Sequence, residues 1–510
     1  MTDFLLISLG LAGQWFLGVA IALAIFGPRL VGLPVRGVGI IVARAELIGL
    51  GFVLGIAGNS YLQFVLSLAG GLLGRECSLI FAFGGLALGL FAMWINCRAI
   101  RTTQSLDSIP QSQSGSACAS ARLARCCAML IGLIFLSALF QALLTPQRLW
   151  DERAYYGLKA IVLFDDRTIF SADLAHADFV QGHPRYPLLI PLAEQHLYAL
   201  LGRVDDRLSK VLFPVLFLGM VLTMAGLLMR HLPLGQAWLG ALLLATTPVL
   251  MPDEYGFLCA QADAPVGCYE GMALFYLWDA LASYGSFPLK RFRWGPSLVV
   301  AAIAGSMVTF TKDEGISHGV VRTIAFIGIL VVTTFASRRV GDTPPPDEPG
   351  SSKGSGWKFG LYAGLALLVI PAILLTPWFA HRHRLPMTTE MNYFGRLSLG
   401  EVWNGIPTLN WSIPHLAWRM FGEATTWGLQ WWFVALTIAL FPKRVLHRPQ
   451  LFLLVTLAGD IAALLLAGMI APVMLEEHIG GSSHRYLMQL APGAVLFALG
   501  QFRNADVKSD

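Results

Sequence analysis

Apolar residues in this chain gather into long blocks and do not alternate with polar ones. A block of about 18 or more apolar residues with few charges predicts a transmembrane helix. Lipid leaves unpaired backbone groups without partners, and nothing here alternates like a barrel strand, so we expect helices. About thirteen blocks can be delimited, at 4–26, 47–71, 78–96, 127–145, 209–230, 235–251, 264–284, 295–310, 318–336, 358–380, 427–442, 450–472 and 486–503.

The composition supports an integral membrane protein. The 510-residue chain is 55% hydrophobic and 13% charged, against about 25% charged residues in a typical soluble domain. Asp3 precedes the first block where a signal peptide would carry a cationic region, and the block is too long for one. We therefore expect an all-α polytopic membrane protein whose first helix is retained.

Lys and Arg between the blocks predict the orientation, because they favour cytoplasmic loops. If thirteen helices alternate, five basic clusters fall on one side, which puts the N-terminus outside and the C-terminus inside: Arg29, Arg36 and Arg44; Arg98, Arg101, Arg122 and Arg125; Lys290, Arg291 and Arg293; Arg338 and Arg339; and Lys443, Arg444 and Arg448. The net charge of +5 is mostly this bias. Since the cations are scattered over separate loops, no nucleic-acid partner is expected. The predicted location is a bacterial inner membrane.

Two segments divide the chain. Residues 101–121 are rich in Ser, Gln and Ala, and residues 341–356 are rich in Pro, Gly and Ser, so both are typical of linkers. We predict an N-terminal three-helix module at 1–100, a cytoplasmic linker at 101–126 and a membrane core at 127–510. The long outer loops would be 146–208 and 381–426, the first with short amphipathic helices on the membrane surface.

Polar clusters stand at the predicted outer ends of the core helices. Charged groups are costly near lipid, so acids and cations at one membrane face predict a reaction on an anionic, lipid-linked substrate. The clusters are Asp151-Glu152 with Tyr155, His183-Pro184-Arg185-Tyr186-Pro187, Asp263-Ala264-Pro265, Thr311-Lys312-Asp313-Glu314-Gly315 and Arg485-Tyr486.

These motifs and their order resemble those of the GT-C glycosyltransferases. Within that superfamily they are most similar to the branch that contains protein mannosyltransferases and the aminoarabinose transferases that modify lipid A. The resemblance covers about residues 127–503 and includes Pro377-Trp378 at the end of the tenth block. It implies transfer of a sugar, with inversion, from a polyprenyl-phosphate donor to the hydroxyl of a lipid, glycan or protein acceptor, at the periplasmic or outer face. The three helices before the core have no counterpart in the simplest members.

The resemblance also implies roles for the acids. Asp151 would be the general base, since a free Asp has a pKa near about 3.9 and is ionised at neutral pH; a structural ion pair with Arg153 or Lys159 is the alternative. Glu152 would orient Asp151 or bind the acceptor, or it would be a helix-start carboxylate. Asp263 would be a second catalytic carboxylate or a helix N-cap.

Lys312, Arg485 and Arg185 would bind the donor phosphate, and Tyr155 and Tyr486 the phosphate or sugar. Lys312 and Arg485 could instead be interfacial snorkelling residues, and in many relatives a proline or small residue occupies the position of Arg185. The motifs identify no particular cofactor. A divalent metal stays open, with Glu477 and His478 as candidates although their spacing makes no metal motif. Asp460 and Asp279 lie within predicted helices and are left outside the site.

Three other functions compete. A polymerase or ligase of lipid-linked glycans would need paired arginines in a large outer loop, for which His381-Arg382-His383-Arg384 is the nearest feature. A transporter would show repeat symmetry and polar residues at the membrane midplane, whereas the clusters here lie at helix ends. A non-catalytic membrane scaffold would not need Asp151, Lys312 and Arg485 to converge.

Overall fold

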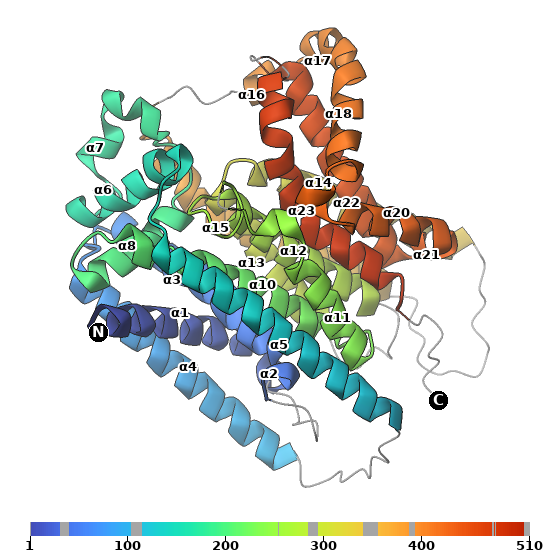
Figure 1. The fold of residues 1–510 in the computed structure, drawn as a ribbon, viewed down its shortest axis with the longest axis horizontal. Coiled ribbons are helices and arrows are strands. Elements are labelled where there is room, and N and C mark those ends of the chain that lie inside the picture. Colours follow the sequence, from blue (N-terminus) through green and yellow to red (C-terminus); the bar gives the residue numbers. More distant parts are fainter. Residues whose placement is uncertain are drawn as a thin grey trace.

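The computed structural model describes residues 2–30, 40–103, 115–252, 254–283, 294–339, 355–386, 393–471, 474 and 476–503. Across these residues the chain is helical with irregular connections and contains no strand, so the all-α expectation is confirmed (Figure 1). The helices before the first long loop are α1 (Thr2–Phe26), α2 (Ile40–Ala43), α3 (Ala45–Leu68), α4 (Arg75–Thr103) and α5 (Gly115–Leu144).

The remaining helices follow in chain order. The first long loop contains η3 (Asp151–Gly157), α6 (Leu158–Asp166), α7 (Ala172–Ala175), η4 (Ala177–Gly182), α8 (Leu189–Leu201) and α9 (Asp206–Ser209). The core continues with α10 (Leu212–Leu228), α11 (Leu234–Ala245), η5 (Pro248–Leu250), α12 (Asp263–Ser283), α13 (Trp294–Thr311), α14 (Gly315–Arg339) and α15 (Ser355–Arg382). The last part comprises α16 (Tyr393–Arg396), α17 (Leu399–Gly405), η6 (Ile406–Thr408), α18 (Leu409–Phe421), α19 (Ala424–Trp427), α20 (Gln430–Leu440), α21 (Pro442–Val445), α22 (Arg448–Ile470), η7 (Glu476–Gly480) and α23 (Gly481–Gly500).

Eight helices among the described residues are long and apolar enough to cross a membrane, which supports an integral membrane protein. They are Thr2–Phe26, Ala45–Leu68, Arg75–Ala99, Cys118–Leu144, Asp206–Leu228, Gly315–Val332, Phe359–Arg382 and Arg448–Ile470. Each of the thirteen predicted blocks coincides with a helix, but thirteen spans are not confirmed. Helices α11 and α20 have 12 and 11 residues. At about 1.5 Å per residue they reach less than about 20 Å, short of a hydrocarbon core of about 30 Å.

Helices α12 and α23 are long enough to span but are too polar to count among the eight. The predicted orientation assumed thirteen alternations, so it stays a prediction. The linker prediction stays a prediction: residues 104–114 lie outside the described part, between α4, which ends at Thr103, and α5, which begins at Gly115. Residues 341–354, most of the second predicted linker, likewise lie outside the described part.

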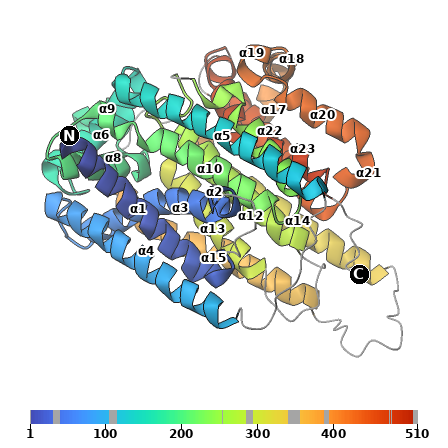
Figure 2. The same cartoon turned by 60° about the horizontal axis from the view of Figure 1, so that its bottom comes forward.

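The N-terminal helices pack backbone against backbone. A Cβ atom on Gly18 would lie 2.0 Å from the carbonyl oxygen of Gly51, and one on Gly55 would lie 1.9 Å from that of Gln14. Only glycine permits such an approach between α1 and α3, as in other membrane helix pairs. Helix α4 runs along α1 in both views (Figures 1 and 2). Helix α3 also packs on α10, so the three helices are joined to the core.

An ion-pair network ties this N-terminal unit to the core. Arg230, after α10, pairs with Glu46 of α3 and donates from Nη1 to Asp279 of α12 over 2.9 Å. His231 Nε2 lies 2.7 Å from Asp279, and the Tyr276 hydroxyl donates to Glu46 over 2.6 Å. Asp279, left outside the predicted site, therefore has a structural role in helix docking.

The first long loop folds into short helices, as predicted, but α8 does not lie on a membrane surface. All thirteen of its residues are buried, and it packs against α1, α3, α4 and α6. The amphipathic prediction is wrong for α8, because the N-terminal helices cover the face that would otherwise meet lipid. In Figure 1, α6 and α7 and helices α16 to α18 all lie in the upper part.

Candidate functional site

Four residues from distant parts of the chain meet in one charged cluster. The Arg485 Nη2 atom lies 2.8 Å from Asp151 Oδ2, and Arg485 Nε donates to Asp263 Oδ2 over 2.8 Å. Lys312 Nζ donates to Asp263 Oδ1 over 2.7 Å. The sequence motifs that contain these four residues are thus brought together, with Asp263 binding both cations.

Each of the four residues stands at or close to an end of a helix. Asp151 opens η3, a π-helix, and Asp263 opens α12. Lys312 directly follows α13 in a tight turn closed by a hydrogen bond from Gly315 N to Lys312 O of 3.0 Å. A Cβ atom on Gly315 would lie 2.5 Å from Thr309 N, so glycine lets the chain turn back here. Arg485 lies in the second turn of α23.

Burial separates the roles of these side chains. Asp263 is 1% exposed and Lys312 is 13% exposed, whereas Asp151 and Arg485 are 26% and 27% exposed. Although burial opposes its charge, the carboxylates of Asp263 and Glu314 raise the pKa of Lys312 above its ordinary value. Asp263 is therefore the buried counter-ion, while Asp151 and Arg485 present the accessible carboxylate and the accessible cation of the cluster.

Three further polar residues complete the cluster: Glu314 belongs to a predicted polar motif but was given no role, and Gln261 and Gln489 were missed in the sequence. Gln261 accepts from Arg485 Nη2 over 3.0 Å. Glu314 lies 2.8 Å from Lys312 Nζ. Gln489 donates from Nε2 to Asp263 Oδ1 over 3.2 Å and to Glu314 Oε2 over 2.9 Å. The spacing of four between Arg485 and Gln489 places them on one helical face, a signal that was available.

Tyr156, and not the predicted Tyr155, is electrostatically coupled to the charges. Burial raises the pKa of Tyr156, and the nearby carboxylates of Asp263 and Asp151 raise it further. In a π-helix residues five apart share a side, so Asp151 and Tyr156 lie on the same face of η3. Tyr155 instead packs its ring on His183, with ring centroids 4.6 Å apart.

Glu152 is a buried structural carboxylate. Its oxygens accept backbone N–H groups of Arg148 at 2.7 Å, Leu149 at 2.9 Å and Ala260 at 2.8 Å, and the Lys210 ammonium at 3.2 Å. Burial acts to raise its pKa, but these donors outweigh burial and lower the pKa. Glu152 therefore fixes the loop that carries Asp151, and none of these bonds connects it to Arg485.

Two other predicted ligands of the donor lie elsewhere. Arg185 donates from Nε and Nη2 to the carbonyl of Leu385, over 3.1 and 3.0 Å, and so ties the first long loop to the second. Tyr486 points the other way along α23 and stacks on His318, with ring centroids 4.8 Å apart.

Of the two predicted metal candidates just before α23, His478 has a described side chain. His478 Nε2 lies 2.5 Å from the Tyr393 hydroxyl, and the Glu477 side chain lies outside the described residues. A different group of three potential ligands occurs within the described residues: Glu270, His318 and Asp460 lie close together and are buried.

This second group is an ion-pair cluster rather than a ready metal site. Arg322 pairs with Glu270, and His318 Nδ1 lies 2.9 Å from Asp460 Oδ1. The other ring nitrogen of His318, Nε2, lies 2.9 Å from Gln489 Oε1. Both imidazole nitrogens are therefore engaged, and a guanidinium already neutralises one carboxylate, which disfavours a cation.

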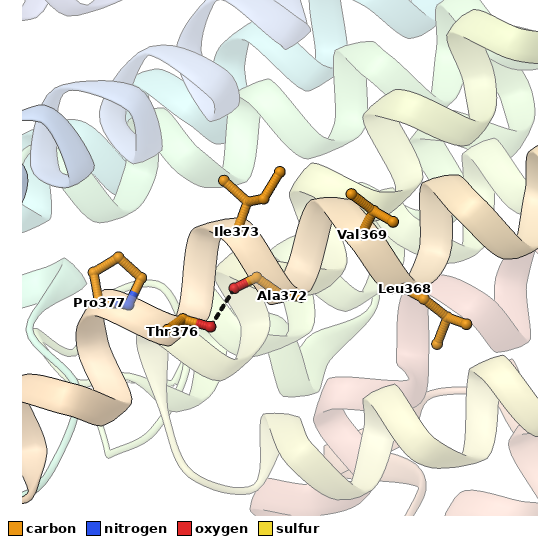
Figure 3. A pocket seen from close by; sticks show the side chains of 6 residues that line it. All are labelled: Leu368, Val369, Ala372, Ile373, Thr376 and Pro377. Atoms are coloured by element: carbon orange, nitrogen blue, oxygen red, sulfur yellow. Dashed lines mark hydrogen bonds between the residues drawn. The ribbon is translucent and has the colours of Figure 1, made fainter.

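A shallow apolar hollow of about 660 Å³ lies along α15 (Figure 3). It ends at Pro377, beside the fully buried Trp378, whose ring packs on Phe310 at 6.0 Å. Phe310 lies two residues before Lys312 in the chain. The hollow is lined by Leu368, Val369, Ala372, Ile373, Thr376 and Pro377.

Comparison with protein-family profiles, curated proteins and solved structures found no match to this chain. The charged cluster and the sequence motifs are therefore the features of the protein that bear on its function.

Proposed function

We propose that this protein is an integral membrane glycosyltransferase of the GT-C type that transfers a sugar from a polyprenyl-phosphate donor to an acceptor hydroxyl. One observation carries the proposal: Asp151, Asp263, Lys312 and Arg485, separated by up to 334 residues in the chain, form one connected cluster of acids and cations. The reaction needs this combination, with a base for the acceptor hydroxyl beside cations for the departing phosphate.

The residues would divide the work by their exposure. Arg485 and Lys312 would bind the phosphate oxygens, Arg485 through its planar fork of donors and Lys312 as a point charge. Asp263, buried against both, would hold them in place. Asp151 is partly exposed and would accept the proton of the acceptor hydroxyl as that oxygen attacks the sugar.

Phosphate binding and activation of the base would be coupled. The Nη2 atom of Arg485 donates to Asp151, so an incoming phosphate competes with Asp151 for the same guanidinium. Occupation of Arg485 by phosphate would leave the Asp151 carboxylate to accept a proton from the acceptor. The order would be donor first, acceptor second. The apolar hollow along α15 would accommodate part of the polyprenyl chain.

The test is a transfer assay with purified protein, a panel of polyprenyl-phosphate sugars and mass-spectrometric detection of the acceptor product. We expect Asp151→Asn to lower the transfer rate at least about 100-fold, as expected for loss of a general base. Asp166→Asn is the matched control, since Asp166 is an exposed acid in the same loop. Wild-type activity in Asp151→Asn would remove Asp151 as the base. Absence of transfer by the wild-type protein to every acceptor would reject the proposed function.

Transport is the second candidate, because the ion-pair cluster of Glu270, His318, Arg322 and Asp460 is buried among the helices. Buried ionisable groups of this kind also occur in proton-coupled transporters. Liposomes that contain the protein and an internal pH-sensitive dye separate transport from sugar transfer. Proton uptake that depends on an added sugar-lipid, without any transferred product, favours transport. The polymerase or ligase alternative predicts a product with more than one added sugar unit.

A further inference from the structure

A second layer of polar residues continues the charged cluster inward along three helices. On each helix the spacing is four or seven residues, so its members share one face. The positions are Asp263 and Glu270 on α12, His318 and Arg322 on α14 with Glu314 just before it, and Arg485 and Gln489 on α23. Asp460 of α22 completes the inner layer, and Gln489 joins the two layers.

The hydrogen bonds of Gln489 define which of its ends faces which layer. Its Nε2 atom lies within 3.2 Å of Asp263 Oδ1 and 2.9 Å of Glu314 Oε2. Ionised carboxylates only accept hydrogen bonds, so the amide NH₂ group must face them. The amide oxygen then faces His318 Nε2 at 2.9 Å and can only accept. His318 Nε2 therefore carries a proton.

The opposite side of the His318 ring is equally constrained. Nδ1 lies 2.9 Å from Asp460 Oδ1, and both side chains are fully buried. A hydrogen bond between them needs one more proton, on either the nitrogen or the carboxyl group, so the pair is neutral overall. The Arg322–Glu270 pair is also neutral. A buried layer of zero net charge avoids the large cost of an uncompensated charge.

We propose that His318, oriented by Asp460, is a positioning residue for the outer site. It donates to Gln489 and so prevents the amide from flipping. Both amide N–H groups then stay on Asp263 and Glu314, which remain ionised and turned toward Lys312. The stacked ring of Tyr486 restricts rotation of the imidazole. Only the activity readout of this inference rests on the proposed function.

The first test is nitrogen NMR of the full-length protein labelled at histidine. We expect the His318 Nε2 resonance to be that of a protonated nitrogen over the range in which the protein is folded. His196 is the internal control, because it is fully buried and neither ring nitrogen has a hydrogen-bond partner among the described residues. Burial lowers the pKa of His196 to about 4, so it should be neutral at pH 7. An unprotonated Nε2 on His318 would overturn the proposal.

The second test is the pH profile of transfer. Loss of hydrogen-bond donors makes a carboxylate easier to protonate, so the acid limb should move to higher pH. One hydrogen bond to a charged group corresponds to a shift of about one pH unit. His318→Phe should show this shift, and Gln489→Met should match it. His318→Gln should restore most of the wild-type profile, because the introduced amide can donate a hydrogen bond to Gln489. An unchanged profile in His318→Phe would refute the positioning role.

The two tests separate this inference from the proposed function. If the wild-type protein transfers no sugar, the proposed function fails, while the NMR measurement still decides the protonation of His318. If His318→Phe does not fold, Gln489→Met replaces it in the pH profile. The groups that face His318 are Asp460, Glu270, Arg322, Gln489 and Tyr486. A His318 resonance that moves on addition of a divalent cation or chelator would show a metal ligand and overturn the proposal.

Discussion

Glu194 should weaken the fold as the pH rises, although it supports the loop that carries Asp151. It lies on α8, fully buried, and accepts from Gln147 Nε2 over 2.5 Å and from the Ser209 hydroxyl over 3.4 Å. Burial raises the pKa of Glu194 to about 8, with the neighbouring Glu152 charge adding to the effect. The folded chain therefore holds this proton more tightly than the unfolded chain, in which the pKa is near 4.5.

The sign and size of the effect follow from this difference. The free energy of unfolding is greatest below pH 4.5, falls as the pH rises and levels off above pH 8. Each pH unit in this window costs about 1.4 kcal/mol, so at pH 7 the loss is about 3 kcal/mol as an upper estimate. Glu194→Gln keeps the acceptor oxygen and carries no charge at any pH. It should therefore be more stable than wild type at pH 7 and similar near pH 4.5.

The assay is thermal unfolding in detergent, followed by tryptophan fluorescence from pH 3 to pH 8 in steps of one pH unit. The quantity of interest is the difference between variant and wild type, because other groups titrate equally in both. Glu152→Gln is the opposing control: its carboxylate has a lowered pKa. That variant should be less stable at pH 7, and the difference should vanish as the pH falls through the folded pKa of Glu152. A Glu194→Gln protein that is no more stable than wild type at pH 7 would refute the reasoning.

Two predictions concern the attachment of the N-terminal helices. Glu46→Gln should lower the free energy of unfolding by about 3 kcal/mol or more, because it leaves Arg230 with a weakened partner in a buried network. The melting temperature should therefore fall. An unchanged melting temperature would mean that Asp279 alone neutralises Arg230. Gly55→Val should separate α1 from α3, because its Cβ would lie 1.9 Å from the Gln14 carbonyl oxygen. Cysteine cross-linking between α1 and α3 should then be less efficient than in the wild-type background, whereas equal efficiency would show that the helices tolerate the larger side chain.

The helical class and the residues of the charged cluster could be predicted from the sequence. The burial of those residues and the number of membrane spans could not. Long apolar blocks report directly on helices, since each helix satisfies its own backbone in lipid. They do not report helix length. Helices α11 and α20 end early although their blocks continue, so a count of thirteen blocks does not by itself confirm thirteen spans.

The site was only partly readable because pairing is a three-dimensional property. Glu152 and Asp151 are adjacent in sequence, yet a helical turn sends them to different partners, Lys210 and Arg485. Nothing in the sequence distinguishes which of the two acids is buried. Gln489 was overlooked because an amide inside an apolar helix has no distinctive motif, although its spacing from Arg485 was visible.

The π-helical turn from Asp151 to Gly157 lets the site tolerate a change of one residue within the turn. A π-helix holds about one extra residue per turn compared with an α-helix. Deleting Ala154 would let the segment close into an ordinary α-helix, in which Tyr156 would follow Asp151 by four residues. Residues four apart share one face of an α-helix, so Tyr156 would stay on the side that Asp151 occupies. Homologous chains should accordingly be compared by the length of this turn as well as by its letters, because a one-residue gap here can retain the arrangement of Asp151 and Tyr156.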